Sequence, residues 1–148
     1  MRTLADEAVH LTLSLIVGIV LAIIFGNWLA ILAAIITGSL IDLDHFVDYF
    51  IYKKFQRFNL KEFLASDYFN DFGKTYILLH GFEYALALIV LGVIFFDLRW
   101  LFFSLGISNL VHLIYDTIYN KPIWPTYFIS FRVAKNFNHK VFDFKCQR

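Results

Sequence analysis

Long runs of apolar residues, separated by short polar breaks, dominate the pattern along this chain. The runs cover about residues 8–25, 28–48, 76–96 and 99–118. Gly26-Asn27 marks a tight turn after the first run, and Asn120-Lys121-Pro122 ends the last one. A helix needs about 20 mainly apolar residues to cross lipid. The pattern therefore predicts one all-α domain with four transmembrane helices.

Two further segments mix cations with aromatic rings. Residues 51–75 combine Lys53, Lys54 and Arg57 with several phenylalanines, and residues 124–144 have a similar character. Such a mixture favours amphipathic helices that lie in the headgroup region, with rings toward the lipid and cations toward water. We expect both segments to be interfacial.

Composition supports a membrane protein and excludes several other classes. The 148 residues are 59% hydrophobic, whereas a soluble domain is usually about 45–50% apolar. The net charge of +1 gives no strong field for nucleic acid, so we expect no such partner. Cys146 is the only cysteine, which excludes a disulfide within the chain and a zinc–thiolate cluster.

The first apolar run could be mistaken for a secretory signal because it follows Arg2. Asp6, Glu7 and His10 interrupt the basic-then-apolar order of a signal, and no convincing small-residue cleavage site follows. We expect a retained membrane helix.

The distribution of cations predicts the orientation. Four helices place both ends of the sequence and residues 51–75 on one side, and Arg99 is the only cation on the other side. The first side holds Arg2, Lys53, Lys54, Arg57, Lys61, Lys74, Lys121, Arg132, Lys135, Lys140, Lys145 and Arg148. By the positive-inside rule, we expect a multi-pass protein of the cell (inner) membrane with both termini cytoplasmic.

Four of the five histidines occur near ends of the predicted helices: His10, His45, His80 and His112. In an up-down-up-down bundle these four ends meet at one face, each only a turn or two inside its helix. The histidines are therefore expected to form one shallow layer beneath the cytoplasmic interface.

Carboxylates accompany these histidines at helical spacing. The i,i+3 or i,i+4 pairs are His112 with Asp116, His80 with Glu83, and Asp42 with His45, while Asp44 lies on the same turn as Asp42. Mixed imidazole and carboxylate sets suit zinc, manganese or iron. We expect one or two divalent ions, zinc foremost, with ligands among His10, Asp42, Asp44, His45, His80, Glu83, His112 and Asp116.

Each pair alone also fits a simpler interpretation, such as an interhelical hydrogen bond or a solvated helix end. An ionisable group within a span costs about 2.5–3.5 kcal/mol unless it has a partner or water. Four carboxylates at one depth also repel one another, and a divalent cation neutralises them directly. The joint arrangement favours metal binding, whereas Glu7 and Asp48 fit solvated or supporting positions and His139 a tail residue.

The order of these elements resembles the YdjM-like membrane-bound metal-dependent hydrolases. The matching elements are His10, Asp42-Leu43-Asp44-His45, His80, His112-Leu113-Ile114-Tyr115-Asp116 and Pro122-Ile123-Trp124-Pro125. The ligand pattern of that family is in turn similar to zinc-dependent phospholipase C enzymes. The family commonly has a second histidine after the one at His80, and this chain instead reads His80-Gly81-Phe82-Glu83. The resemblance implies a hydrolase in which Glu83 takes the place of the missing histidine.

The resulting hypothesis is a membrane-embedded metal-dependent hydrolase that acts on a phosphoester or ester, with membrane lipids as the natural partners. Asp44 or Glu83 is the candidate general base. No Gly-x-Ser-x-Gly sequence occurs, which disfavours a serine nucleophile. Two alternatives remain open: a metal-ion binding or transport protein without hydrolytic activity, and a structural protein whose polar cluster fixes helix register.

Overall fold

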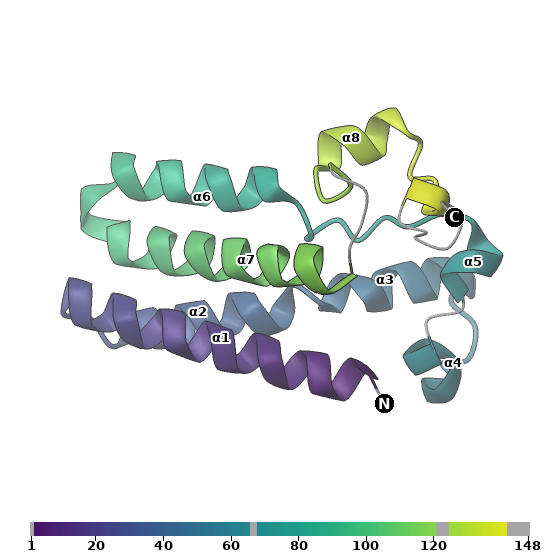
Figure 1. The fold of residues 1–148 in the computed structure, drawn as a ribbon, viewed down its shortest axis with the longest axis horizontal. Coiled ribbons are helices and arrows are strands. Elements are labelled where there is room, and N and C mark those ends of the chain that lie inside the picture. The colour runs from purple at the N-terminus through teal and green to yellow at the C-terminus, as the bar shows by residue number, and fades with distance from the viewer. Residues whose placement is uncertain (1, 66–67, 121–124, 142–148) are drawn as a thin grey trace.

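The protein is described by a computed structural model that covers residues 2–65, 68–120 and 125–141 (Figure 1). Its elements are α1 (Arg2–Phe25), α2 (Leu29–Leu40), α3 (Leu43–Tyr52), α4 (Leu60–Ala65), α5 (Tyr68–Phe72), α6 (Phe82–Ile94), the 3₁₀ turn η1 (Phe96–Leu98), α7 (Arg99–Asn120), α8 (Ile129–Ala134) and the 3₁₀ turn η2 (His139–Val141). The predicted all-α class is confirmed over these residues. Pro122-Ile123-Trp124, Cys146 and the end of the predicted 124–144 segment lie outside them.

Helices α1, α2, α6 and α7 lie along one another and form an elongated bundle (Figure 1). Three stretches in the described part of the chain are long and apolar enough to cross a membrane: Ala5–Phe25, Leu29–Tyr52 and Phe96–Asn120. The 24 residues of α1 extend about 36 Å at 1.5 Å per residue, more than the ~30 Å hydrocarbon layer. These stretches agree with three of the four predicted spans.

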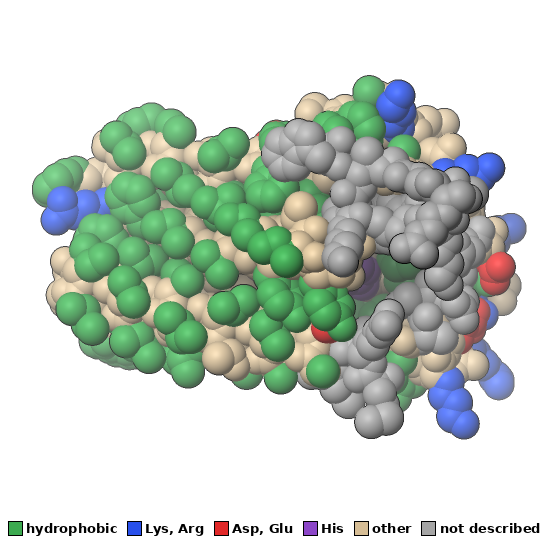
Figure 2. Space-filling model, in the orientation of Figure 1, with side chains coloured by type: hydrophobic (Ala, Val, Ile, Leu, Met, Phe, Trp, Pro, Cys, Tyr) green, Lys and Arg blue, Asp and Glu red, His purple; other side chains and the backbone are tan. Residues whose placement is uncertain are grey.

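The outside of the bundle is apolar and its inside is built from small residues. Green side chains cover the bundle surface away from the charged end (Figure 2), and Ile23 and Val93 are 78% and 70% exposed. Ala30, Ala34 and Ser104, by contrast, are fully buried. Close contact through small residues is how helices pack when lipid, rather than water, surrounds them.

A short break separates α2 from α3 at Ile41 and Asp42. The backbone keeps right-handed helical dihedrals through the break, but the N–H groups of Asp44 and His45 bond to carbonyls three residues back. A local 3₁₀ turn of this kind re-aims the side chains that follow it. It therefore sets the directions of Asp42, Asp44 and His45 at the end of the bundle.

The helix predicted for residues 76–96 differs from the structure. This helix, α6, begins at Phe82 rather than near residue 76, and its 13 residues extend only about 20 Å. Residues 75–81 are non-helical, with Thr75, Ile77 and His80 almost fully buried. Irregular backbone at membrane depth is tolerated where protein encloses it and satisfies its polar groups. The predicted helix start is wrong because side chains from elsewhere bond this segment, as described below.

The predicted interfacial segment of residues 51–75 contains two short helices rather than one long one. Tyr68 and Phe69 are only 1% and 9% exposed and pack in the hydrophobic core with Tyr49. Phe55, in contrast, is 80% exposed. The rings of this segment are therefore divided between the core and the surface, whereas the sequence pattern had suggested that all face the lipid.

Candidate metal centre

The structure gathers the four predicted histidines at one end of the bundle. His10 comes from α1, His45 from α3, His112 from α7, and His80 from the non-helical segment before α6. His10, His80 and His112 are buried, and the His45 side chain is 33% exposed. We call these histidines together with Asp42 and Asp116 the ligand layer.

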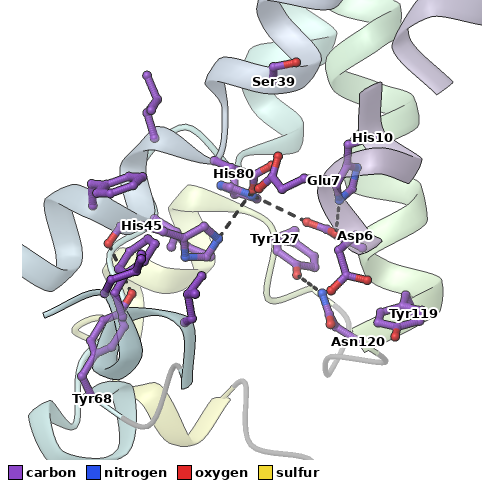
Figure 3. Close-up of a pocket in the computed structure, with 18 residues that line it drawn as sticks. Asp6, Glu7, His10, Ser39, His45, Tyr68, His80, Tyr119, Asn120 and Tyr127 are labelled. Atoms are coloured by element: carbon purple, nitrogen blue, oxygen red, sulfur yellow. Dashed lines mark hydrogen bonds and ion pairs between the residues drawn. The ribbon is translucent and has the colours of Figure 1, made fainter. Parts of the chain in front are cut away.

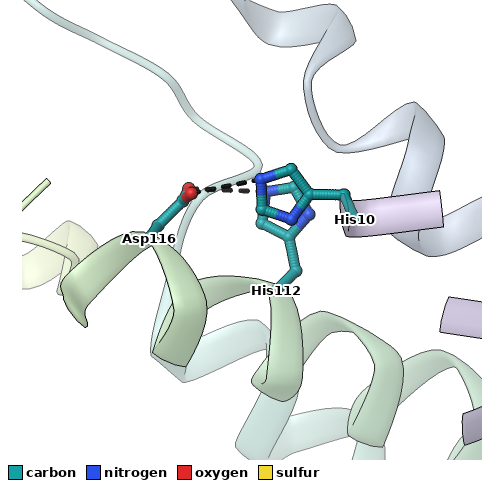
Figure 4. A group of neighbouring side chains, drawn as sticks. All are labelled: His10, His112 and Asp116. Atoms are coloured by element: carbon teal, nitrogen blue, oxygen red, sulfur yellow. Dashed lines mark ion pairs between the residues drawn. The ribbon is translucent and has the colours of Figure 1, made fainter. Parts of the chain in front are cut away.

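Three residues of the ligand layer form its first group (Figure 4): His10, His112 and Asp116. The two imidazole rings stack with their centroids 3.7 Å apart. Asp116 lies 3.2 Å from His10 Nε2 through Oδ1 and 3.4 Å from His112 Nε2 through Oδ2. The predicted i,i+4 pairing of His112 with Asp116 is thus present, and the group offers one donor atom per residue for a metal ion.

The second group consists of Asp42, His45 and His80. Asp42 Oδ1 lies 3.1 Å from His80 Nε2 and 3.6 Å from His45 Nε2. The two groups adjoin, because His80 Nε2 is 3.6 Å from Asp116 Oδ2 and His112 Nε2 is 3.6 Å from Asp42 Oδ1. All four Nε2 atoms therefore converge on two carboxylates.

The hydrogen bonding of His112 fits a metal ligand. Its Nδ1 lies 3.2 Å from the carbonyl oxygen of Gly38, which can only accept, so Nδ1 carries the proton. Nε2 is therefore the atom directed toward Asp42 and Asp116, and it is buried with no hydrogen-bond partner among the described residues. When the ring is neutral, this Nε2 carries a lone pair that a metal ion between it and the two carboxylates would bind.

His80 shows the arrangement that commonly orients a metal-binding imidazole. Its Nδ1 donates to Asp44 Oδ2 at 3.0 Å, which leaves Nε2 directed at Asp42. His80 is thus held between two carboxylates, with Asp44 on its Nδ1 side and Asp42 on its Nε2 side.

Asp44 lies behind the ligand layer rather than in it. Its Oδ2 also accepts a hydrogen bond of 2.7 Å from Leu79 N, and Asp44 is not in either group of donors. Asp48, one turn further along α3, accepts from Tyr76 N and Ile77 N. The two carboxylates together hold the segment that carries His80. The i,i+4 spacing of Asp44 and Asp48 was the available sequence signal for this pair.

Arg132 completes the support of His80, a role that no local sequence pattern indicates. The side chain is fully buried and donates to the carbonyls of Tyr76 and Ile77 at 2.7 Å and of His80 at 2.6 Å. Although counted above as an interfacial cation, Arg132 is an internal residue. Its hydrogen bonds explain why residues 76–80 stay non-helical, since these carbonyls are bonded by a side chain instead of by the N–H groups of a helix.

Glu83 is not brought to the ligand layer. Its carboxylate accepts hydrogen bonds from Ile129 N, Ser130 N and Ser130 Oγ at 2.8–3.0 Å, at the start of α8. The prediction that His80 and Glu83 share a helix face is wrong because α6 begins between them, at Phe82. His139, the fifth histidine, lies 2.6 Å from Thr75 Oγ1 through Nδ1 and stacks on Phe69, outside the layer.

The ligand layer borders a cavity of about 460 Å³ (Figure 3). Its lining includes His10, Asp42, His45, His80 and Asp116 from the layer, together with Asp6, Glu7, Ser39, Tyr119, Asn120 and Tyr127. Glu7 lies one turn before His10 on α1 and is exposed to the cavity. The sequence pattern predicted a solvated or supporting position for Glu7, although its i,i+3 spacing from His10 indicates a shared helix face.

No family model, curated protein or solved structure matches this chain. The resemblance to YdjM-like hydrolases therefore remains a prediction from the motifs. The described geometry establishes two adjoining His/Asp groups that could hold a metal ion, next to a cavity.

Proposed function

We propose that this protein is a membrane-embedded, metal-dependent hydrolase of the YdjM-like type that cleaves a phosphoester or ester at the membrane interface. One observation carries the proposal: the Nε2 atoms and carboxylates of the ligand layer converge at the wall of a cavity large enough for a ligand. A purely structural cluster would need no such opening.

The residues present fit a divalent ion, and zinc is the first choice. His10, His112 and Asp116 would hold one ion, and Asp42, His45 and His80 would hold a second or share the first. Neutral imidazole with carboxylate and no thiolate suits zinc, with manganese or iron as alternatives. Such an ion lowers the pKa of a bound water and polarises the oxygen of the bond under attack.

Among the described residues, Glu7 is the carboxylate that best fits the role of proton acceptor. A general base must reach the attacking water and must not be committed elsewhere. The carboxylate of Asp44 already holds Leu79 and His80, and that of Glu83 holds the start of α8. Glu7 lines the cavity beside the ligand layer (Figure 3), so we propose that it takes the role first considered for Asp44 and Glu83.

The charge distribution supports a cytoplasmic site with lipid partners. Lys and Arg side chains gather at the end of the molecule that carries the cavity (Figure 2). At the other end, Arg99 stacks over Phe96 with 4.0 Å to the ring centroid. By the positive-inside rule the cavity end faces the cytoplasm, and both termini with it. An ester at headgroup depth is then the accessible substrate.

The test compares two matched glutamates in purified protein loaded with zinc and reconstituted in bilayers. Wild type should hydrolyse a lipid phosphoester or ester above the blank. Glu7→Gln should keep its zinc and lose about 10²–10⁴-fold in turnover, the usual value of a general base. Glu83→Gln makes the same chemical change away from the cavity and should keep turnover, with a small loss of stability. Zinc binding without any hydrolysis would instead favour the metal-binding or transport alternative.

A further inference from the structure

The cavity has two kinds of wall. Its polar side belongs to the ligand layer and its neighbours. The other side is formed by apolar residues of two helices, Leu43 and Phe46 from α3 and Leu60, Phe63 and Leu64 from α4. We call these five residues the apolar wall. Nothing in the proposed hydrolysis of an ester bond requires an apolar wall, so it calls for its own explanation.

The apolar wall is held in place rather than loosely attached. Phe46 and Phe63 stack with their ring centroids 4.3 Å apart, which joins α3 to α4. The hydroxyl of Tyr49, a fully buried residue, donates to Glu62 Oε2 at 3.1 Å and accepts from Asn59 N at 3.1 Å. These contacts fix the position of α4 against α3. The space between the wall and the ligand layer is thus a built feature of the fold.

The apolar wall is continuous with the outer apolar surface of the bundle. Leu32, Ile36, Leu40 and Leu43 follow one another at helical spacing on the span Leu29–Tyr52, and each is between 43% and 50% exposed. Leu43 also lines the cavity. A hydrocarbon chain could therefore pass from surrounding lipid into the cavity without crossing water.

We propose that the cavity binds a single-chain anionic amphiphile, with its phosphate-type head at the ligand layer and its chain along the apolar wall. This inference rests on the proposed function for the metal that receives the head. The wall forms one side of one cavity of about 460 Å³, which suits one chain. The substrate class then narrows to monoacyl or monoalkyl esters.

The test uses butyl-, hexyl- and octylphosphonate, whose carbon–phosphorus bond is not hydrolysed. Binding to zinc-loaded protein in an uncharged detergent is measured by calorimetry, with empty micelles as the blank. Burial of each added methylene should tighten binding by up to about fourfold. Metal-free protein should bind all three probes much more weakly, because the head then has no cation.

Two variants place a charge in the wall, and a third is their control. Leu60→Asp and Leu64→Asp should remove most of the dependence on chain length, since a chain cannot pack against a carboxylate. Leu98→Asp changes an exposed leucine (45%) outside the cavity, in the turn between α6 and α7, and should keep this dependence. Leu60 is itself 56% exposed, so this variant should fold even if Leu64→Asp does not.

Three results would overturn the inference: binding that does not depend on chain length, equal chain dependence in Leu60→Asp and Leu98→Asp, or equal binding with and without zinc. The outcome is separable from that of the proposed hydrolysis. Chain-dependent phosphonate binding without turnover would leave the amphiphile site and remove the hydrolase. Turnover that does not depend on chain length would support the hydrolase and contradict the amphiphile site.

Discussion

Removal of the Asp116 carboxylate should abolish about half or more of the stabilisation that zinc gives to this protein. Asp116 approaches three imidazoles, those of His10 at 3.2 Å, His112 at 3.4 Å and His80 at 3.6 Å, and so touches both groups of the ligand layer. Its replacement by alanine removes a donor from the first group and a neighbouring charge from the second. The perturbation therefore tests the layer as a whole.

The expected magnitude follows from linkage. Free zinc at one hundred times its dissociation constant stabilises the folded state by about 2.7 kcal/mol. An unfolding entropy of about 2.1 cal/mol/K per residue gives about 0.3 kcal/mol/K for 148 residues, so wild type should melt about 9 °C higher with zinc. Loss of even a supporting group weakens metal binding about 10- to 100-fold. The zinc shift of Asp116→Ala should accordingly fall below about 5 °C.

Scanning fluorimetry of detergent-purified protein, with zinc and with chelator, measures both shifts. Asp97→Ala is the control, because Asp97 is an exposed carboxylate in η1, at the turn between α6 and α7. It should retain the full shift of wild type. A wild type that zinc does not stabilise, or equal shifts in Asp116→Ala and Asp97→Ala, would refute the metal assignment of the ligand layer.

Four further predictions concern the support of His80, the pH dependence of zinc binding, the packing of the helices beneath the ligand layer, and the membrane topology. Asp44→Asn should lower zinc affinity about 10- to 100-fold in calorimetry, since an amide is a weaker acceptor for the His80 ring; an unchanged affinity would contradict a positioning role. Zinc binds imidazole and carboxylate groups only after they lose their protons, so zinc affinity should fall as the pH is lowered from about 8 to 6. Affinity independent of pH between about pH 6 and 8 would count against this. Gly38→Ala should weaken zinc binding although Gly38 is not a metal ligand, because the new Cβ would collide with a side chain of α1 and move the helices apart. A zinc shift equal to that of wild type in fluorimetry would contradict this tight packing. Reporter fusions in residues 55–58 should read cytoplasmic and those at Asn27 exterior, and a shared side would exclude the proposed orientation.

Hydropathy was sufficient to predict the long helices that bury one whole face in the bundle and expose the other. The end of α1 and both limits of α7 follow from long apolar runs bounded by turn-forming residues, whereas α1 begins at Arg2, before its apolar run. The helical period also placed Asp116 beside His112. These features depend on interactions within one helix. The sequence therefore carries them in its local pattern.

The segment before α6 could not be predicted in the same way. Residues 76–80 are apolar enough to start a helix, and no local signal forbids it. Their N–H and C=O groups are taken by Asp44, Asp48 and Arg132, which are distant in sequence and meet them only in the folded chain. The misplacement of Glu83 has the same origin, because its helix face depends on where α6 begins. Long-range hydrogen bonds of single side chains produce no periodic pattern in the amino-acid sequence.

The contacts that position the ligand layer lie one helical turn deeper in the bundle. Ser14 follows His10 by four residues, and Ser108 precedes His112 by four, so each lies directly beneath a ligand on its own helix. Ser108 Oγ lies 3.2 Å from Ser14 Oγ and donates to a carbonyl of α2 at 2.8 Å, while Gly38 leaves no room there for a side chain. This contact brings α1, α2 and α7 close enough for His10 and His112 to stack. The small residues that pack the helices therefore also determine the spacing of the candidate donors above them, so the geometry of the candidate metal centre depends on helix packing.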